Sequence, residues 1–215
     1  MTKDSSRPRK PKRGQTREAL MAAALDLVVK KAPFSSLSLR EVTKRAGVVP
    51  TAFYRHFPDM SALGLTLLDE SFRTLRQMMR QVRQEELPNE RMLRGSIETY
   101  FNYVRNNRAH FLFVAKELFG GTPTMRNAIR REIRMFTNEL AMDMARFPFL
   151  NHVNAEDLQM MAGLVVNNVT ALTQEMLELE EDDDYGQQQV LQTAEKQLRL
   201  IYFGVGQWKS SNASS

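Results

Sequence analysis

The sequence predicts an all-α protein with a small N-terminal helical head and a larger helical body. Apolar residues recur at the three- and four-residue spacing of helices along most of the chain. Prolines and glycines fall at the joints between these segments, and no segment shows the sustained period-two alternation that is typical of a strand. With 215 residues, 42% of them hydrophobic, the chain is long enough to bury a substantial core.

Charge divides the chain into parts. Residues 1–58 carry 13 Lys or Arg and 4 Asp or Glu, a net charge of +9, whereas residues 59–215 carry a net charge of −4. This asymmetry is typical of a polyanion-binding part joined to an acidic body. We therefore expect a basic disordered arm at 1–14, a head at 15–58 and a body at 59–215. The arm is either a solvated tail or a segment that contacts nucleic acid.

Several classes of function are excluded by what the sequence lacks. It has no cysteine, and therefore no disulfide or Cys-ligated metal. Its three histidines, His56, His110 and His152, are widely spaced, and there is neither a nucleophile motif nor a phosphate-binding loop. We expect no enzyme activity, no metal site and no cofactor. Without a signal peptide or an apolar run of about 20 residues, the expected location is the cytoplasm.

The head is predicted to contain three helices. The first covers 16–31 and stops at Pro33, because the residue before a proline is pushed out of the helical region. The second begins with a capping box formed by Ser38 and Glu41 and ends at Gly47. The third covers 50–57, with Pro50 at its first position.

This succession of helix, short helix, Gly-containing turn and short helix is typical of a helix-turn-helix, whose second helix enters the major groove of DNA. Phe53 and Phe57 are four residues apart and are expected to pack inward. Hydroxyl, guanidinium and imidazole groups are then left for phosphates and base edges. Taken singly, Tyr54 could be a core residue with an exposed hydroxyl, and His56 could be a surface histidine. Together on one short helix, beside a basic arm, they favour DNA contact. The four residues are Thr51, Tyr54, Arg55 and His56.

The body is predicted to be helical throughout, with helices near 59–86, 89–106, 108–118, 123–146, 155–180 and 185–209. The acidic run at 180–184 is interpreted as a solvated loop. Apolar residues of the last two helices recur in two regular rows, at 158–179 and 191–208. Such rows either form a four-helix bundle with a second subunit or pack into the core of their own monomer.

Flexible and aromatic residues are concentrated in the body, which holds 11 of the 13 methionines and 9 of the 12 phenylalanines. Methionine adapts to irregular space and to variable apolar guests, although such a pattern is also typical of a plain core. Asn168 interrupts an apolar helix face near Val165 and either hydrogen-bonds in an interface or contacts a ligand. The other candidate lining residues are Tyr100, Phe101, Val104, Phe111, Phe113, Val114, Ile133, Phe136 and Leu140.

Three segments of the head, residues 34–42, 46–48 and 51–57, resemble the signature of the TetR family of bacterial regulators, over about residues 16–65. Residues 63–66 and 69–71 extend the similarity to the branch that contains FabR and DesT, which repress genes for unsaturated fatty acids. Two positions depart from the family pattern. Met60 stands where a phosphate-contacting lysine is usual, and Pro33 replaces a usual glycine.

For individual residues, the resemblance implies that Arg40, Tyr54 and His56 contact phosphates. Four residues would face the groove, namely Pro50, Thr51, Ala52 and Arg55. Ser38 completes the set of candidate DNA-binding residues.

For partners, the resemblance implies a homodimer on a palindromic double-stranded operator, joined through the last two helices, and a long-chain acyl-CoA in the body. The predicted function is a repressor of fatty-acid synthesis or desaturation genes. One alternative is a TetR-like repressor that responds to an unrelated hydrophobic molecule. A second alternative, a non-sensing architectural DNA protein, predicts weak sequence preference and a salt dependence set by the arm.

Overall fold

The computed structural model describes residues 13–84 and 90–210. Within these ranges the chain is helical and contains no strand, which confirms the all-α prediction. The expected basic arm lies outside the described residues except for its last two, which open the first helix. In the part of the chain that is described, no helix is both long and apolar enough to cross a membrane.

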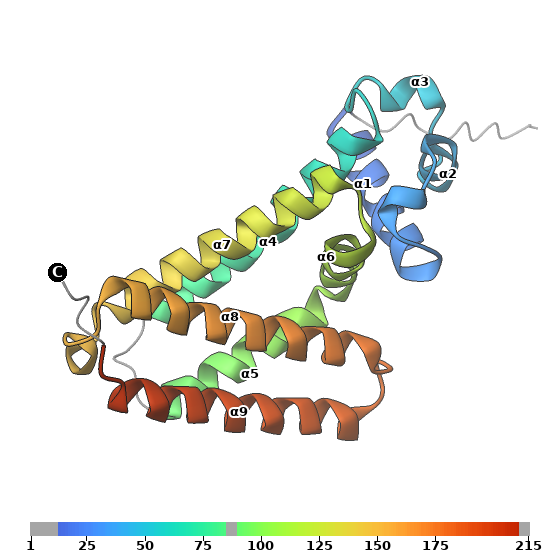
Figure 1. Cartoon of the computed structure of the whole chain (residues 1–215). Coiled ribbons are helices and arrows are strands. Elements are labelled where there is room, and N and C mark those ends of the chain that lie inside the picture. Colours follow the sequence, from blue (N-terminus) through green and yellow to red (C-terminus); the bar gives the residue numbers. More distant parts are fainter. Residues whose placement is uncertain (1–12, 85–89, 211–215) are drawn as a thin grey trace, which may run out of the picture.

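The head consists of α1 (Arg13–Lys30), a short 3-10 helix η1 (Phe34–Ser36), α2 (Leu39–Arg45) and α3 (Pro50–Phe53) (Figure 1). The predicted capping box is present. The Ser38 N–H donates to Glu41 Oε2 at 2.9 Å, and the Glu41 N–H donates to Ser38 Oγ at 3.3 Å. The turn after α2 places Gly47 at a φ of 68°, a left-handed conformation that glycine adopts without strain.

The third helix is shorter than the predicted 50–57. It ends at Phe53, and residues 54–56 form turns. Pro58 disfavours a helical conformation at Phe57, so the helix cannot include the last predicted residue. The N–H groups of His56 and Phe57 both donate to the Phe53 carbonyl, at 2.9 and 3.0 Å.

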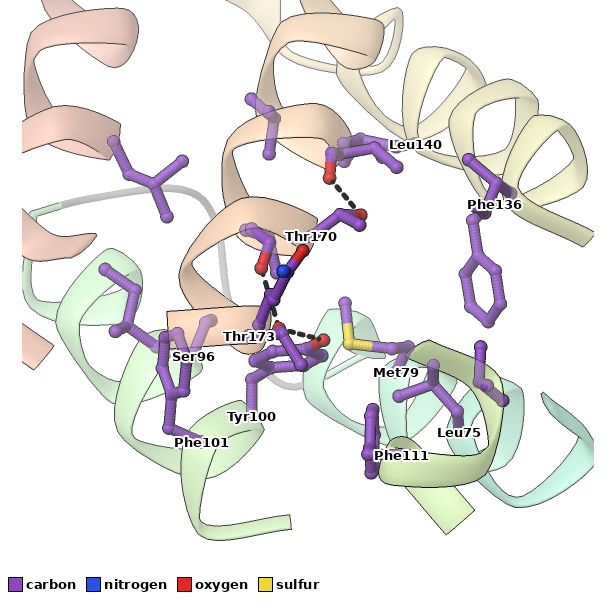
Figure 2. A pocket seen from close by; sticks show the side chains of 18 of the residues that line it. Leu75, Met79, Ser96, Tyr100, Phe101, Phe111, Phe136, Leu140, Thr170 and Thr173 are labelled. Atoms are coloured by element: carbon purple, nitrogen blue, oxygen red, sulfur yellow. Dashed lines mark hydrogen bonds between the residues drawn. The ribbon is translucent and has the colours of Figure 1, made fainter. Parts of the chain in front are cut away.

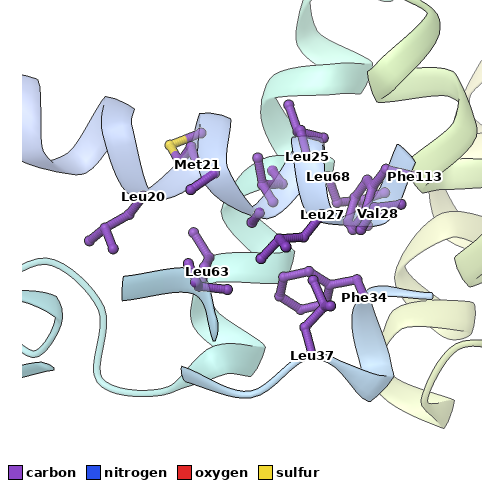
Figure 3. Packing of buried hydrophobic residues seen from close by; sticks show 14 of the residues in the cluster. Leu20, Met21, Leu25, Leu27, Val28, Phe34, Leu37, Leu63, Leu68 and Phe113 are labelled. Atoms are coloured by element: carbon purple, nitrogen blue, oxygen red, sulfur yellow. The ribbon is translucent and has the colours of Figure 1, made fainter. Parts of the chain in front are cut away.

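Phe53 and Phe57 pack inward as predicted, and the exposed fraction of Phe53 is 0%. The core around them is not confined to the head. Figure 3 shows Phe34 and Leu37 of the head packed together with Leu63 and with Phe113, which belong to the body. One continuous core therefore joins the two parts.

The body contains α4 (Met60–Gln84), α5 (Glu90–Asn106), α6 (Arg108–Gly120), α7 (Pro123–Met144), a 3-10 helix η2 (Pro148–Leu150), α8 (Ala155–Glu178) and α9 (Asp184–Gln207). All six predicted body helices are present, with ends close to those expected. Side chains cap several of them; Asp59 Oδ1, for example, accepts from the Ala62 N–H at 2.8 Å at the start of α4.

Two long helices, α4 and α7, run side by side from the head along the body (Figure 1). Next to them, α7 packs against α8, α8 against α9, and α9 against α5. Helix α6 contacts α1 and η1 on one side and α4, α7 and α8 on the others. Besides α4, which follows the head in the chain, α6 is therefore the body helix that packs against the head.

The two apolar rows of the last helices lie inside the monomer. Leu172 and Met176 of α8 and Ala194 and Leu198 of α9 are buried in one core cluster of the same chain. Of the two interpretations of these rows, the structure therefore shows packing within the monomer. A different set of apolar side chains stays exposed on these helices, namely Met160, Leu164, Leu200 and Phe203.

The acidic segment after α8 is partly a structural joint and not only a solvated loop. Arg108 Nη2 donates to the carbonyls of Leu177 and Leu179, at 2.7 and 2.8 Å, and so caps the C-terminus of α8. Asp183 Oδ1 accepts from the Gly186 N–H at 2.8 Å and caps the start of α9.

Candidate DNA-binding face and ligand cavity

The polar residues predicted to contact DNA are mostly exposed on the head. Arg40, Thr51 and Arg55 are exposed, and Tyr54 is exposed to 62% although its ring contacts Phe53 edge-on. Within the described part of the chain, the Arg55 guanidinium has no hydrogen-bond or ion-pair partner. This leaves its donors available for a phosphate or a guanine edge.

The remaining DNA-contact candidates differ in how accessible they are. Pro50 is exposed, whereas Ala52 and His56 are half-buried. The Ser38 hydroxyl donates to Glu41 Oε2 at 2.8 Å, so its hydrogen serves the capping box. The pKa of Glu41 is lowered first by the hydrogen bond from the Ser38 backbone N–H, then by that from the Ser38 hydroxyl, and further by the charge and hydrogen bond of Lys31.

The position of α2 relative to α1 is fixed by Asp26. Its carboxylate contacts Lys30 Nζ at 2.6 Å and accepts from Arg45 Nε at 2.7 Å. The bond from Lys30, followed by that from Arg45, lowers the pKa of Asp26. Arg45 is therefore engaged within the head. The other basic residue at the end of α2, Lys44, is also exposed and was not predicted from the sequence as a DNA contact.

The body contains a cavity of about 360 Å³, lined by α4, α5, α6, α7, α8 and α9 (Figure 2). Its wall is almost entirely apolar. Eight of the eleven residues predicted to bind a ligand lie on it: Tyr100, Phe101, Phe111, Val114, Ile133, Phe136, Leu140 and Val165.

Three predicted residues lie elsewhere. Phe113 points to the opposite side of α6, where its ring meets that of Phe34 edge-on at 5.6 Å. Val104 is buried in the core cluster formed with α8 and α9. Asn168 donates from Nδ2 to Gln197 Oε1 of α9, which places it between the last two helices.

Sequence analysis missed a row of lining residues on α4, namely Phe72, Leu75 and Met79. They continue the stripe that begins with Leu68 in the head core, so their three- and four-residue spacing was the available signal. Helix α4 thus contributes to both the head core and the cavity wall.

Two facing hydroxyls interrupt the apolar wall. Tyr100 Oη of α5 lies 2.9 Å from Thr173 Oγ1 of α8 (Figure 2). Burial raises the pKa of Tyr100 to about 12, against the lowering effect of its bond to Thr173. The phenol therefore remains protonated at any physiological pH.

Helix α6 joins the cavity to the head. Val114, Ala115 and Leu118 face the cavity, whereas Lys116 and Glu117 face the head. Lys116 Nζ donates to the Val28 carbonyl near the end of α1 at 2.5 Å. Glu117 is fully buried, and its Oε1 accepts from the Ser35 N–H at 3.3 Å.

A second link holds α6 against α4. The Ser71 hydroxyl donates to the Leu67 carbonyl at 2.8 Å, and its oxygen lies 2.8 Å from His110 Nδ1. Because the hydroxyl hydrogen is used, His110 Nδ1 must be the donor of the second bond. Burial lowers the pKa of His110, opposed by the charge of Glu70.

Glu117 and Glu41 predict opposite pH dependences of stability. Burial raises the pKa of Glu117, so its contribution to stability is largest at acidic pH and declines as the pH rises through its folded-state pKa. Glu117→Gln should therefore stabilise the protein at neutral pH by about 1 kcal/mol, because the charge is removed where Oε2 has no hydrogen-bond partner among the described residues. The gain should vanish below pH 4, as measured by urea unfolding.

Glu41→Gln is the matched control for this substitution. The pKa of Glu41 is lowered, so its contribution is present above the unfolded-state pKa and declines as the pH falls. The Glu41→Gln protein should therefore be less stable than the parent at neutral pH. If both variants gave the same pH slope, burial of Glu117 would not govern its ionisation.

The described residues contain no group of His, Asp and Glu side chains that could hold a metal ion. What the structure does combine is an exposed polar helix-turn-helix face and an apolar cavity, linked by α4 and α6. The head is that of a helix-turn-helix DNA-binding protein.

Family models identify the class more closely. The model for bacterial regulatory proteins of the tetR family matches residues 20–65. The model for the tetracyclin repressor-like C-terminal domain matches residues 88–204, more than half of the chain. The chain therefore belongs to the TetR family. It is a DNA-binding transcriptional regulator and not an enzyme, and regulators of this family dimerise.

Solved structures show the same fold. A TetR-family transcriptional regulator from Streptomyces coelicolor is 18% identical, with a TM-score of 0.69 over 90% of this chain and 97% of that one. The fatty acid degradation regulator FadR from Bacillus halodurans is 17% identical, with a TM-score of 0.62 over 88% and 99%. FadR from Bacillus subtilis, in complex with stearoyl-CoA, is 14% identical, with a TM-score of 0.63 over 86% and 96%.

Proposed function

We propose that this regulator represses genes of fatty-acid synthesis or desaturation and responds to a long-chain acyl-CoA bound in its body. The observation that carries the proposal is the apolar cavity of about 360 Å³, which falls within the size range of small-molecule sites. The resemblance of residues 34–71 to the FabR and DesT branch supports the choice of genes. The stearoyl-CoA complex of a protein with the same fold supports the choice of ligand.

An alkyl chain suits this cavity chemically. Each methylene moved from water into an apolar wall contributes about 0.8 kcal/mol, so affinity should rise about fourfold for each carbon that enters. The wall offers few polar groups to a charged ligand. We therefore place the acyl chain inside the cavity and the coenzyme A outside it.

The ligand would act on the head through α4 and α6. Phe72 and Met79 of α4 line the cavity, while Leu63 and Leu67 of the same helix lie in the head core. A ligand shifts an equilibrium between two head positions only if it binds one of them better. Contacts along α4 provide such a difference, since a displaced cavity wall displaces the core beneath the head.

We further propose that the dimer forms through the exposed apolar side chains of α8 and α9. Leu200 is 74% exposed, and Leu164, Phe203 and Met160 are also exposed on these two helices. Exposed apolar groups of this size favour burial in an interface. A dimer places two heads on two half-sites of a palindromic operator.

Two substitutions in the head test the DNA face. Tyr54→Phe should weaken binding to all sequences alike, because a hydroxyl directed at a phosphate carries no base information. Arg55→Ala should cost about 1–3 kcal/mol and also relax base preference, as expected for a guanidinium that reads a base edge. Binding is measured by anisotropy on the operator and on its single-base variants. Unchanged preference for Arg55→Ala would assign Arg55 to the backbone.

Native mass spectrometry of freshly purified protein, followed by calorimetry with a series of saturated acyl-CoA chains, tests the ligand. We expect a bound acyl-CoA mass and an affinity that rises with chain length until the cavity is filled. A co-purifying mass of another hydrophobic compound, together with no binding of any acyl-CoA, would favour the alternative ligand class. Footprinting on a palindrome tests the architectural alternative, which predicts no protected site.

A further inference from the structure

The direction of two hydrogen bonds in the cavity wall is fixed by their partners. Thr173 Oγ1 lies 2.7 Å from the Val169 carbonyl oxygen, which can only accept. The single hydroxyl hydrogen of Thr173 is therefore used in that bond. In the 2.9 Å bond between Tyr100 and Thr173, the hydrogen must consequently come from Tyr100.

Because the hydrogens of these hydroxyl groups are already used, the hydroxyl oxygens in the cavity wall can only accept hydrogen bonds from a ligand. Tyr100 Oη has given its hydrogen to Thr173, and no donor among the described residues occupies its lone pairs. The neighbouring Thr170 likewise donates to the Val166 carbonyl, at 2.7 Å. The dashed lines of Figure 2 join Tyr100 to Thr173 and join the hydroxyls of Thr170 and Thr173 to carbonyls of their own helix. The ring of Tyr100 faces apolar neighbours.

We infer that Tyr100 and Thr173 determine which alkyl chains the cavity admits. Chains that are unsubstituted, or that carry a hydroxyl at the position that reaches Tyr100, bind. Chains with a keto oxygen at that position are disfavoured. The inference rests on the proposed function, in that it assumes an alkyl chain in the cavity. It names Tyr100 as a specificity-determining residue.

The reason is the asymmetry between the two substituents. A hydroxyl can donate to a free lone pair of Tyr100 Oη and leaves the Tyr100–Thr173 bond intact. A keto oxygen can only accept, so it must either take the Tyr100 hydrogen away from Thr173 or stay without a partner among apolar side chains. Losing one hydrogen bond in a buried site weakens binding by roughly tenfold.

The test compares matched pairs of ligands on the full-length protein. Hydroxystearoyl-CoA and oxostearoyl-CoA, with the oxygen placed at successive even-numbered carbons, are titrated by calorimetry beside stearoyl-CoA. Matched dodecanols and dodecanones are titrated in parallel, because they probe the cavity without coenzyme A. At the chain position that reaches Tyr100, we expect the hydroxy compound to bind about tenfold more tightly than the keto compound.

Substitutions of the two residues should change this preference in two different ways. Tyr100→Phe should abolish the difference, because the lone pairs and the hydrogen are both removed. Thr173→Val should invert it, because Tyr100 then has a free hydrogen to donate to a ketone. Thr173→Ser restores the hydroxyl and should restore the parent's order. Thr170→Val, which changes a hydroxyl that does not contact Tyr100, should leave the order unchanged.

The outcomes separate this inference from the proposed function. Equal binding of hydroxy and keto partners at every position, with stearoyl-CoA bound, would overturn the inference and leave the ligand class standing. A preference shown by the dodecanols and inverted by Thr173→Val, with no binding of stearoyl-CoA, would support the inference and overturn the acyl-CoA proposal. Thermal unfolding of each variant shows whether the protein is folded. If Thr173→Val does not fold, the hydroxy and keto affinities of the Thr173→Ser protein are compared with those of Tyr100→Phe.

Discussion

Ala115→Phe should abolish binding of stearoyl-CoA while the protein still binds its operator. Ala115 lies on the cavity side of α6, between Val114 and Leu118. A phenyl ring at this position would occupy space that the acyl chain needs. Displacing three or four methylenes, at about 0.8 kcal/mol each, corresponds to a loss of about 100-fold in affinity. Calorimetry with stearoyl-CoA measures this loss, and anisotropy measures the operator affinity.

The same substitution at Ala145 is the control. Ala145 caps the end of α7, is exposed, and does not line the cavity. Ala145→Phe should leave the affinity for stearoyl-CoA within twofold of the parent. Undiminished binding by the Ala115→Phe protein would mean that the acyl chain lies outside this cavity.

Phe113→Ala should cost about 3–5 kcal/mol in the free energy of unfolding, because it empties a fully buried position where head and body meet. It should also reduce the effect of stearoyl-CoA on operator affinity, since the contact of α6 with Phe34 is lost. Ligand affinity itself should change little, because Phe113 faces away from the cavity. Urea unfolding and operator titrations with and without stearoyl-CoA measure these effects.

Phe119→Ala on the same helix is the matched control for stability. Phe119 is 70% exposed, so its removal should cost less than 1 kcal/mol by the same measure. A similar cost for the two substitutions would contradict the placement of Phe113 in the core that joins head and body.

The head could be predicted from the sequence because its signals are local. The Ser38–Glu41 capping box, Gly47 in a left-handed conformation and Pro50 at the first position of α3 each follow from the chemistry of neighbouring residues. The exception is the length of α3, which ends at Phe53 and not at residue 57 as predicted.

The cavity was predicted less completely, because periodicity gives the faces of a helix but not what each face meets. Phe111 and Phe113 are two residues apart on α6, so they point to different sides: Phe111 to the cavity and Phe113 to the head. The row on α4 was missed for a related reason. Its residues were predicted only as part of the helix near 59–86, although that helix is long enough to reach from the head core to the cavity.

The last two helices show the same limit. Their regular rows, which include Leu172 and Leu198, were compatible with either a dimer or a monomer core, and the structure places them in the core. The exposed residues Leu164 and Leu200 lie within the same two stretches of sequence, and each has only one exposed apolar partner at helical spacing, Met160 and Phe203 respectively. Periodicity alone therefore could not identify the outer surface of these helices.

The central claim is that occupation of the body cavity alters how the head binds DNA. Anisotropy titrations of the full-length protein on a two-fold symmetric operator and on scrambled DNA, each with and without stearoyl-CoA, test it most directly. We predict a clear preference for the operator and an operator affinity that stearoyl-CoA changes at least fivefold, with no such change in the Ala115→Phe protein. Equal binding to both DNAs, or the same operator affinity at saturating stearoyl-CoA, would contradict the account.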